Sequence, residues 1–121
     1  MTEHDDPIVG KIIRAVPFPV NVECNGYPDV IFHIIFQRRP EPSEADQAAI
    51  ALDNYAQAYN RLHFLRPIHY VSEPNNSFSQ NASVFSACIH MDFGNANPNA
   101  LLGAVKAIAA TRLLIFRLIL E

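Results

Sequence analysis

Two stretches of the chain have the pattern of central β-strands: the first is rich in Val, Ile and Phe, and the second alternates between apolar and polar residues. The stretches cover residues 27–37 and 83–93. Because successive side chains of a strand point to opposite faces, each stretch places one wholly apolar set on a single face of a sheet. We expect these sets to form the core: Val30, Phe32, Ile34 and Phe36 from the first strand, and Phe85, Ala87, Ile89, Met91 and Phe93 from the second.

Three shorter segments also have the pattern of strands. Residues 16–24 alternate in the same way and lead into Asn25-Gly26, which favours a tight turn and a hairpin with the next strand. Residues 68–72 and 113–120 are the other two, although continuation of the preceding helix is an alternative for 113–120. The polar segment 73–82 predicts a loop.

Two segments have apolar residues at helical spacing. The first begins at Ser43, a good N-cap, and ends before Pro67 because a residue that precedes proline avoids the α region. The second follows Asn97 as N-cap, with Pro98 at the first helical position. Leu52 and Val105 lie on the apolar sides of these helices, so we expect both in the core.

The resulting order, β-β-α-β-β-α-β, predicts an α+β fold. We expect a single-layer mixed or antiparallel β-sheet with two helices on one face, in one domain spanning residues 1–121. Without its first strand this is the ferredoxin-like, split βαβ pattern. The N-terminal hairpin and the last strand would compete for the same edge, so the sequence leaves the strand order open. Residues 1–12 are expected to be a loosely ordered arm.

Composition and charge narrow the choice of partners. The chain has 9 Lys and Arg against 12 Asp and Glu, which gives a net charge of −3 and argues against a nucleic-acid partner. The longest apolar stretch, 113–120, is interrupted by Arg117 and is too short for a membrane span. No secretory signal is evident, and two cysteines are too few for a disulfide framework. We therefore expect a cytoplasmic protein.

Polar residues on the other face of the two central strands are the candidates for chemistry. His90 and Asp92 share that face, and His33 lies on the neighbouring strand, so together they could bind a metal or move a proton. This spacing is common in strands, however, and the chain has no phosphate-binding, nucleophile-elbow or zinc-protease motif. We expect no metal, no cofactor and no catalytic residue. Cys88 is expected to be a small buried residue, and the Arg38-Arg39 pair a solvated strand end.

These features favour a non-enzymatic binding module that acts through protein–protein contact. Two helices can cover only one face of the sheet, so the other face should expose apolar residues and meet a partner. That partner is a second copy, or another protein that this chain inhibits as an immunity protein would. The expected interface consists of Ile31, His33, Ile35, Gln37, His90, Ile115 and Ile119, with Phe78 in the polar loop. The alternative is a small enzyme or metabolite-binding domain that uses His33, His90 and Asp92.

Overall fold

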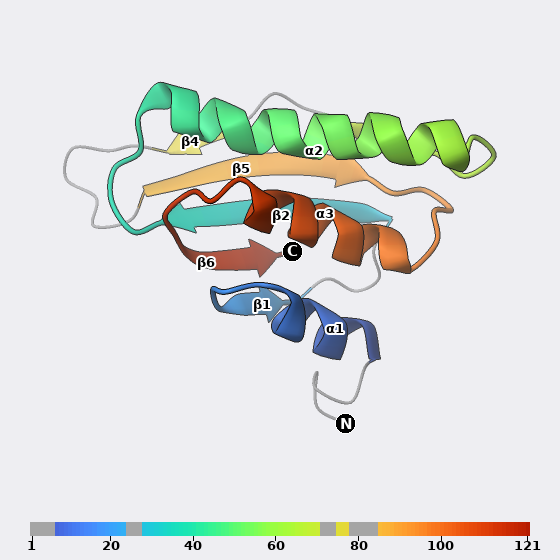
Figure 1. Cartoon of the computed structure of the whole chain (residues 1–121), viewed down its shortest axis with the longest axis horizontal. Coiled ribbons are helices and arrows are strands. Elements are labelled where there is room, and N and C mark those ends of the chain that lie inside the picture. The colour runs from blue at the N-terminus through green and yellow to red at the C-terminus, as the bar shows by residue number, and fades with distance from the viewer. Residues whose placement is uncertain (1–6, 24–27, 71–74, 78–84) are drawn as a thin grey trace.

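The computed structural model describes residues 7–23, 28–70, 75–77 and 85–121 (Figure 1). In chain order its elements are α1 (Pro7–Ala15), β1 (Val20–Val22), β2 (Asp29–Phe36), α2 (Pro42–Leu62), β3 (His69–Tyr70), β4 (Asn75–Ser77), β5 (Phe85–Asp92), α3 (Asn99–Ala110) and β6 (Ile115–Leu120).

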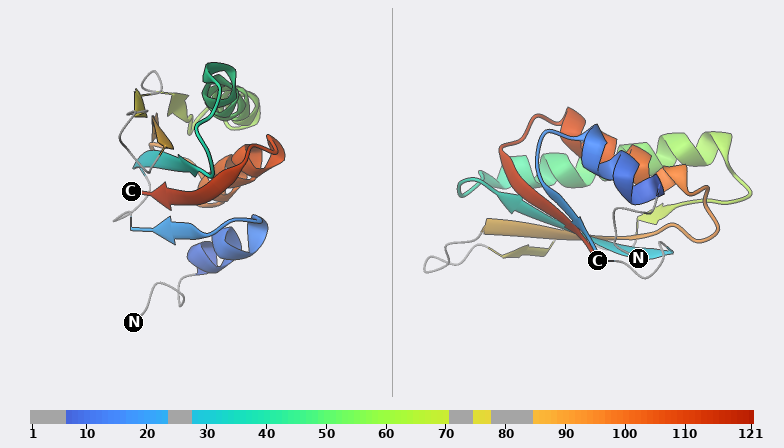
Figure 2. Two further views of the ribbon diagram at one scale, coloured as in Figure 1. Left: turned by 90° about the vertical axis from the view of Figure 1, so that its left-hand side faces the viewer. Right: turned by 90° about the horizontal axis from the view of Figure 1, so that it is seen from below.

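The strands form a single mixed sheet, so the fold is α+β, as the alternation of elements predicts. The strand order is β1-β6-β2-β5-β3, and β4 also pairs with β5. β1 runs parallel to β6, whereas the other pairs are antiparallel. Figure 2 shows α1, α2 and α3 on the same side of the sheet, which leaves the opposite side without helices.

The predicted hairpin between the first two strands is wrong. β1 pairs with β6, and β6 lies between β1 and β2. β6 contributes Leu118 and Leu120 to the core, so a central position buries more of its apolar surface than an edge would. The competition for one edge is thereby resolved, with the N-terminal strand outermost. Asn25 and Gly26 lie outside the described residues.

The N-terminal segment differs from the expected arm. Residues 7–12 form the first part of helix α1, and Ile12 is fully buried. α1 contacts α3, which places a third helix over the sheet (Figure 2). Residues 1–6 of the expected arm lie outside the described residues.

The segment predicted as a loop contains a short strand. β4 pairs with Ser86, Ala87 and Cys88 of β5, whereas β3 pairs only with the two residues at the far end of that strand. The outer edge of β5 would otherwise leave its N–H and C=O groups unpaired, and backbone pairing needs no apolar side chains. This explains why a polar sequence can form a strand here.

The predicted core is confirmed at nearly every position. All four inward residues of β2 are buried, as are Ala87, Ile89, Met91 and Phe93, and so are Leu52 and Val105 from the helices. Phe85 is only partly buried, at the end of β5.

Ile115 does not lie on the helix-free face, contrary to the sequence prediction. It is buried, because the register of β2 with β6 shifts between Ile35 and Phe36 and sets Ile115 opposite the core residue Phe36. This irregularity breaks the simple alternation that would have grouped Ile115 with Ile119.

Local interactions fix the ends of the helices. Helix α2 is capped by Glu41 rather than Ser43, and the Glu44 carboxylate accepts a hydrogen bond from the Glu41 N–H at 2.9 Å. Pro98 is the N-cap of α3, one residue later than predicted, and the Oδ1 of Asn97 accepts a hydrogen bond from the Asn99 N–H at 2.9 Å. Arg112 adopts a φ of 60°, which ends α3 and separates it from β6, so the alternative of one long terminal helix is wrong. No helix among the described residues is long and apolar enough to span a membrane.

Candidate functional site

The helix-free side of the sheet, here called the open face, carries three parallel rows of side chains. The register of β1, β6, β2 and β5 places four residues side by side in a central row: Asn21, Ile119, His33 and Cys88. On one side lies the arginine row, which consists of Arg117, Ile35 and Ser86. On the other lies the glutamate row, which consists of Glu121, Ile31 and His90.

Cys88, His33 and Glu121 form a chain of contacts on this face. The Sγ of Cys88 lies 3.1 Å from Nδ1 of His33, and Nε2 of His33 lies 2.7 Å from Oε2 of Glu121. The second contact has the distance of an ion pair but not the geometry of a hydrogen bond. The imidazole is therefore held between a sulfur and a carboxylate.

The proton arrangement follows from the surroundings of the sulfur. Burial raises the pKa of the Cys88 thiol, and the negative charge of Glu121 raises it further. The sulfur is therefore a protonated thiol at neutral pH, 3.1 Å from Nδ1 of His33. A protonated thiol is a poor nucleophile, so this arrangement does not favour cysteine catalysis.

The three residues of the predicted chemical alternative are not brought together. His33 contacts Cys88 and Glu121, whereas Nε2 of His90 lies 3.2 Å from Oδ1 of Asp29. Oδ1 of Asp92 accepts a hydrogen bond from the N–H of Gly94 at 2.8 Å, in the turn that follows β5. Among the described residues, no group of three or more His, Cys, Asp or Glu side chains within one chain is arranged to hold a metal ion.

Apolar side chains complete the open face. Ile31, Ile35 and Ile119 are each partly exposed and lie in different rows of the open face. Gln37 lies beyond them, exposed, with its Nε2 donating to the carbonyl of Ile115 at 3.3 Å. Phe78, the remaining residue of the predicted interface, lies outside the described residues.

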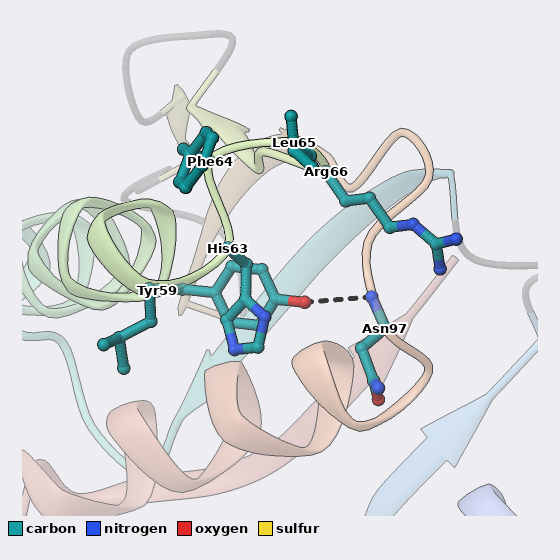
Figure 3. Close-up of a pocket in the computed structure, with 7 residues that line it drawn as sticks. Tyr59, His63, Phe64, Leu65, Arg66 and Asn97 are labelled. Atoms are coloured by element: carbon teal, nitrogen blue, oxygen red, sulfur yellow. Dashed lines mark hydrogen bonds between the residues drawn. The ribbon is translucent and has the colours of Figure 1, made fainter.

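A second candidate surface lies in the turn between α2 and β3 (Figure 3). Leu62, Phe64 and Leu65 are 79%, 73% and 83% exposed, and they border a cavity of about 330 Å³. Figure 3 shows Phe64 and Leu65 projecting away from the stacked rings of Tyr59 and His63. Apolar side chains with this exposure are typical of contact surfaces.

Hydrogen bonds and ring stacking hold this turn in place. The rings of Tyr59 and His63 stack with their centroids 4.2 Å apart, and the Tyr59 hydroxyl accepts from the Asn97 N–H at 2.9 Å (Figure 3). The Asn60 amide makes two hydrogen bonds to the backbone of Ile68, both at 2.7 Å. Sequence reasoning missed this surface. Its signal is Phe64-Leu65 just before Pro67, in a stretch that the sequence pattern assigned to the end of the helix.

Arg38 of the Arg38-Arg39 pair is bound to a carboxylate of the same chain. The Arg38 guanidinium makes two hydrogen bonds to the Glu44 carboxylate, at 3.0 and 3.2 Å. With the hydrogen bond from the Glu41 N–H, which has the larger effect, this pairing lowers the pKa of Glu44.

Comparisons with models of known protein families, with curated proteins and with solved structures find no match to this chain.

Proposed function

We propose that this protein is a non-enzymatic binding module that forms a homodimer by packing the open faces of two sheets against each other. The observation that carries the proposal is the self-complementary order of the three rows. A closed dimer uses the same patch on both subunits, so each residue must meet a suitable partner after a rotation by 180°.

The relevant axis runs along the central row, across the strands and between the two sheets. Rotation about it places the arginine row of one copy over the glutamate row of the other. Ile35 then meets Ile31 of the second copy, and Arg117 meets Glu121 of the second copy. Ile119 lies on the axis and meets its own counterpart. Ser86 meets His90 of the second copy, and Asn21, His33 and Cys88 lie on the axis with Ile119. The facing residues are therefore apolar on apolar, polar on polar or of opposite charge.

Packing of this kind is favourable for the residues involved. Sheets stack about 10 Å apart, so their facing side chains interdigitate and the partly exposed isoleucines leave water. The side chain of Glu121 is 61% exposed and that of Asp29 is 73% exposed, so both carboxylates are accessible to an arginine from outside the chain. The exposed Arg117 supplies the opposite charge. Charge pairing at the rim fixes the register more than it adds affinity.

We also infer a ferredoxin-like core for the segment from β2 to β6. Its order along the chain is β2-α2-β3-β5-α3-β6 when β4 is set aside, and its order across the sheet is β6-β2-β5-β3. This is the split βαβ pattern with β1 added beyond the last strand. The extra strand widens the open face without covering it.

Two alternatives make different predictions. An enzyme that uses His33, His90 and Asp92 has less support, because these side chains make separate contacts. An inhibitor resembling an immunity protein would meet a different protein through the same face. For that function the purified chain should stay monomeric.

A charge exchange tests the dimer. Arg117→Glu places two carboxylates over each other and should weaken self-association strongly, as measured by sedimentation equilibrium. Arg117→Glu combined with Glu121→Arg restores opposite charges in exchanged positions and should recover most of the association. Lys106→Glu changes an exposed charge on α3 and serves as the control. Loss in the single variant without recovery in the double variant would contradict the proposed axis.

A further inference from the structure

We propose that the paired open faces bind one Zn²⁺ ion, with Cys88 and His33 of each copy as its four ligands. This inference rests on the proposed homodimer. Within one chain the two side chains supply only a sulfur and a nitrogen. Rotation about the central row brings the same two atoms from the second copy, because both residues belong to that row. Two cysteines and two histidines are a common ligand set for structural zinc.

The ligand atoms are already close together. The Cys88 Sγ and His33 Nδ1 atoms are 3.1 Å apart. Two such ligands of a tetrahedral zinc ion are separated by about 3.5 Å, given bonds of about 2.3 Å to sulfur and 2.0 Å to nitrogen. A shift of about 0.4 Å therefore opens the pair to accept the ion.

Glu121 supplies the support that zinc-binding histidines usually have. Such a histidine binds the metal through one ring nitrogen and directs the other toward a carboxylate, which fixes its orientation. In this protein Nδ1 faces the sulfur, while Nε2 lies 2.7 Å from the Glu121 carboxylate. Glu121 is exposed enough to rotate into hydrogen-bond alignment. His90 has a carboxylate neighbour as well, but no sulfur.

The distance between stacked sheets suits a shared ion. A midplane lies about 5 Å from each sheet when the sheets are about 10 Å apart. A cysteine side chain and a Zn–S bond of about 2.3 Å reach that far. The site is also neutral in total, since two thiolates balance the charge of Zn²⁺. Binding releases the two thiol protons to solvent.

Titration with Zn²⁺ and with Co²⁺ tests the site in reduced protein. We expect one metal ion per two chains, and for Co²⁺ the intense sulfur-to-metal absorption of a thiolate complex. Below the thiol pKa the apparent affinity should rise about a hundredfold per pH unit, because two protons leave. Cys88→Ser and His33→Ala should each abolish stoichiometric uptake. Cys24→Ser, which removes the other cysteine of the chain, should retain it.

The outcomes separate this inference from the dimer on which it rests. A dimer that takes up no metal would overturn the zinc site and leave the proposed function standing. A monomer that binds one metal ion per chain would overturn the shared site and the dimer together. Uptake that survives Cys88→Ser would contradict the ligand assignment.

Discussion

The burial of Ile89 tests which face of the sheet belongs to the core. It is fully buried in β5, opposite Phe32 of β2. Ile89→Ala should lower the free energy of unfolding by about 2–5 kcal/mol, because it leaves a cavity that the neighbours fill only in part. Ile50→Ala removes the same atoms from a side chain that is 57% exposed and should cost less than about 0.5 kcal/mol. Denaturation by urea measures both. A loss below about 1 kcal/mol for Ile89→Ala would mean that the core face is misassigned.

Tyr55 links packing to the pH dependence of stability. Its hydroxyl donates to the Ala100 carbonyl at 2.7 Å, and its ring lies so close to Gly103 that a β-carbon there would displace it. Burial is the main cause that raises the pKa of Tyr55 from 10.0 to about 12. Above pH 10 the unfolded chain loses this phenolic proton while the folded chain keeps it. Stability present below pH 10 is therefore lost between pH 10 and 12.

The measurement is the free energy of unfolding as a function of pH from 9 to about 11.5. Tyr55→Phe removes the titrating group and should flatten the decline in this range relative to the wild type. An unchanged slope in Tyr55→Phe would show that other groups cause it.

Sequence reasoning identified single residues well where one face of an element is apolar throughout. Phe32, Ile34 and Met91 are buried because strand alternation alone decides their side. It failed for Ile115, whose side depends on a register shift against another strand. It also did not pair His33 with Cys88, since that contact requires the register between β2 and β5.

At the scale of elements, helix α1 packs one of two neighbouring isoleucines into the core. Ile12 is fully buried, whereas its neighbour Ile13 is 40% exposed. Ile12→Ala should therefore destabilise the protein by about 2–5 kcal/mol, while Ile13→Ala should cost less than about 1 kcal/mol. Thermal or urea unfolding of the two variants checks this. Equal small effects would mean that the N-terminal segment is the loose arm that its position suggests.

Element types were predictable because their signals are local. Both long strands, helices α2 and α3 and the strand β6 follow from periodicity and from residues such as Pro67 and Asn97. Pairing was not predictable in the same way. Asn25-Gly26 favours a hairpin locally, but the gain from placing β6 centrally is a property of the whole sheet. β4 was missed because it is held by backbone pairing with β5. Such pairing requires no apolar side chains, so the polar sequence contains no strand pattern.

At the scale of the whole molecule, the three helices lie on one side of the sheet, and the open face carries no helix (Figure 2). The sequence predicted this face and most of its residues, since it needs only the alternation of β2 and β5. It could not predict the three rows, which arise from the register of four strands. The exposed turn at Phe64 was missed because the sequence suggests a continuing helix.

Sedimentation of one variant tests whether two open faces pack together. Ile35→Glu places a charge over Ile31 of the second copy, where burial against an apolar side chain is costly. Ile50→Glu is the matched control on α2, since that side chain is 57% exposed. Circular dichroism verifies that both variants fold.

Over a series of concentrations, the wild type and Ile50→Glu should sediment as dimers, and Ile35→Glu should sediment as a monomer. A wild type that is monomeric throughout the series, or an Ile35→Glu variant that dimerises as the wild type does, would show that the open faces do not pack together.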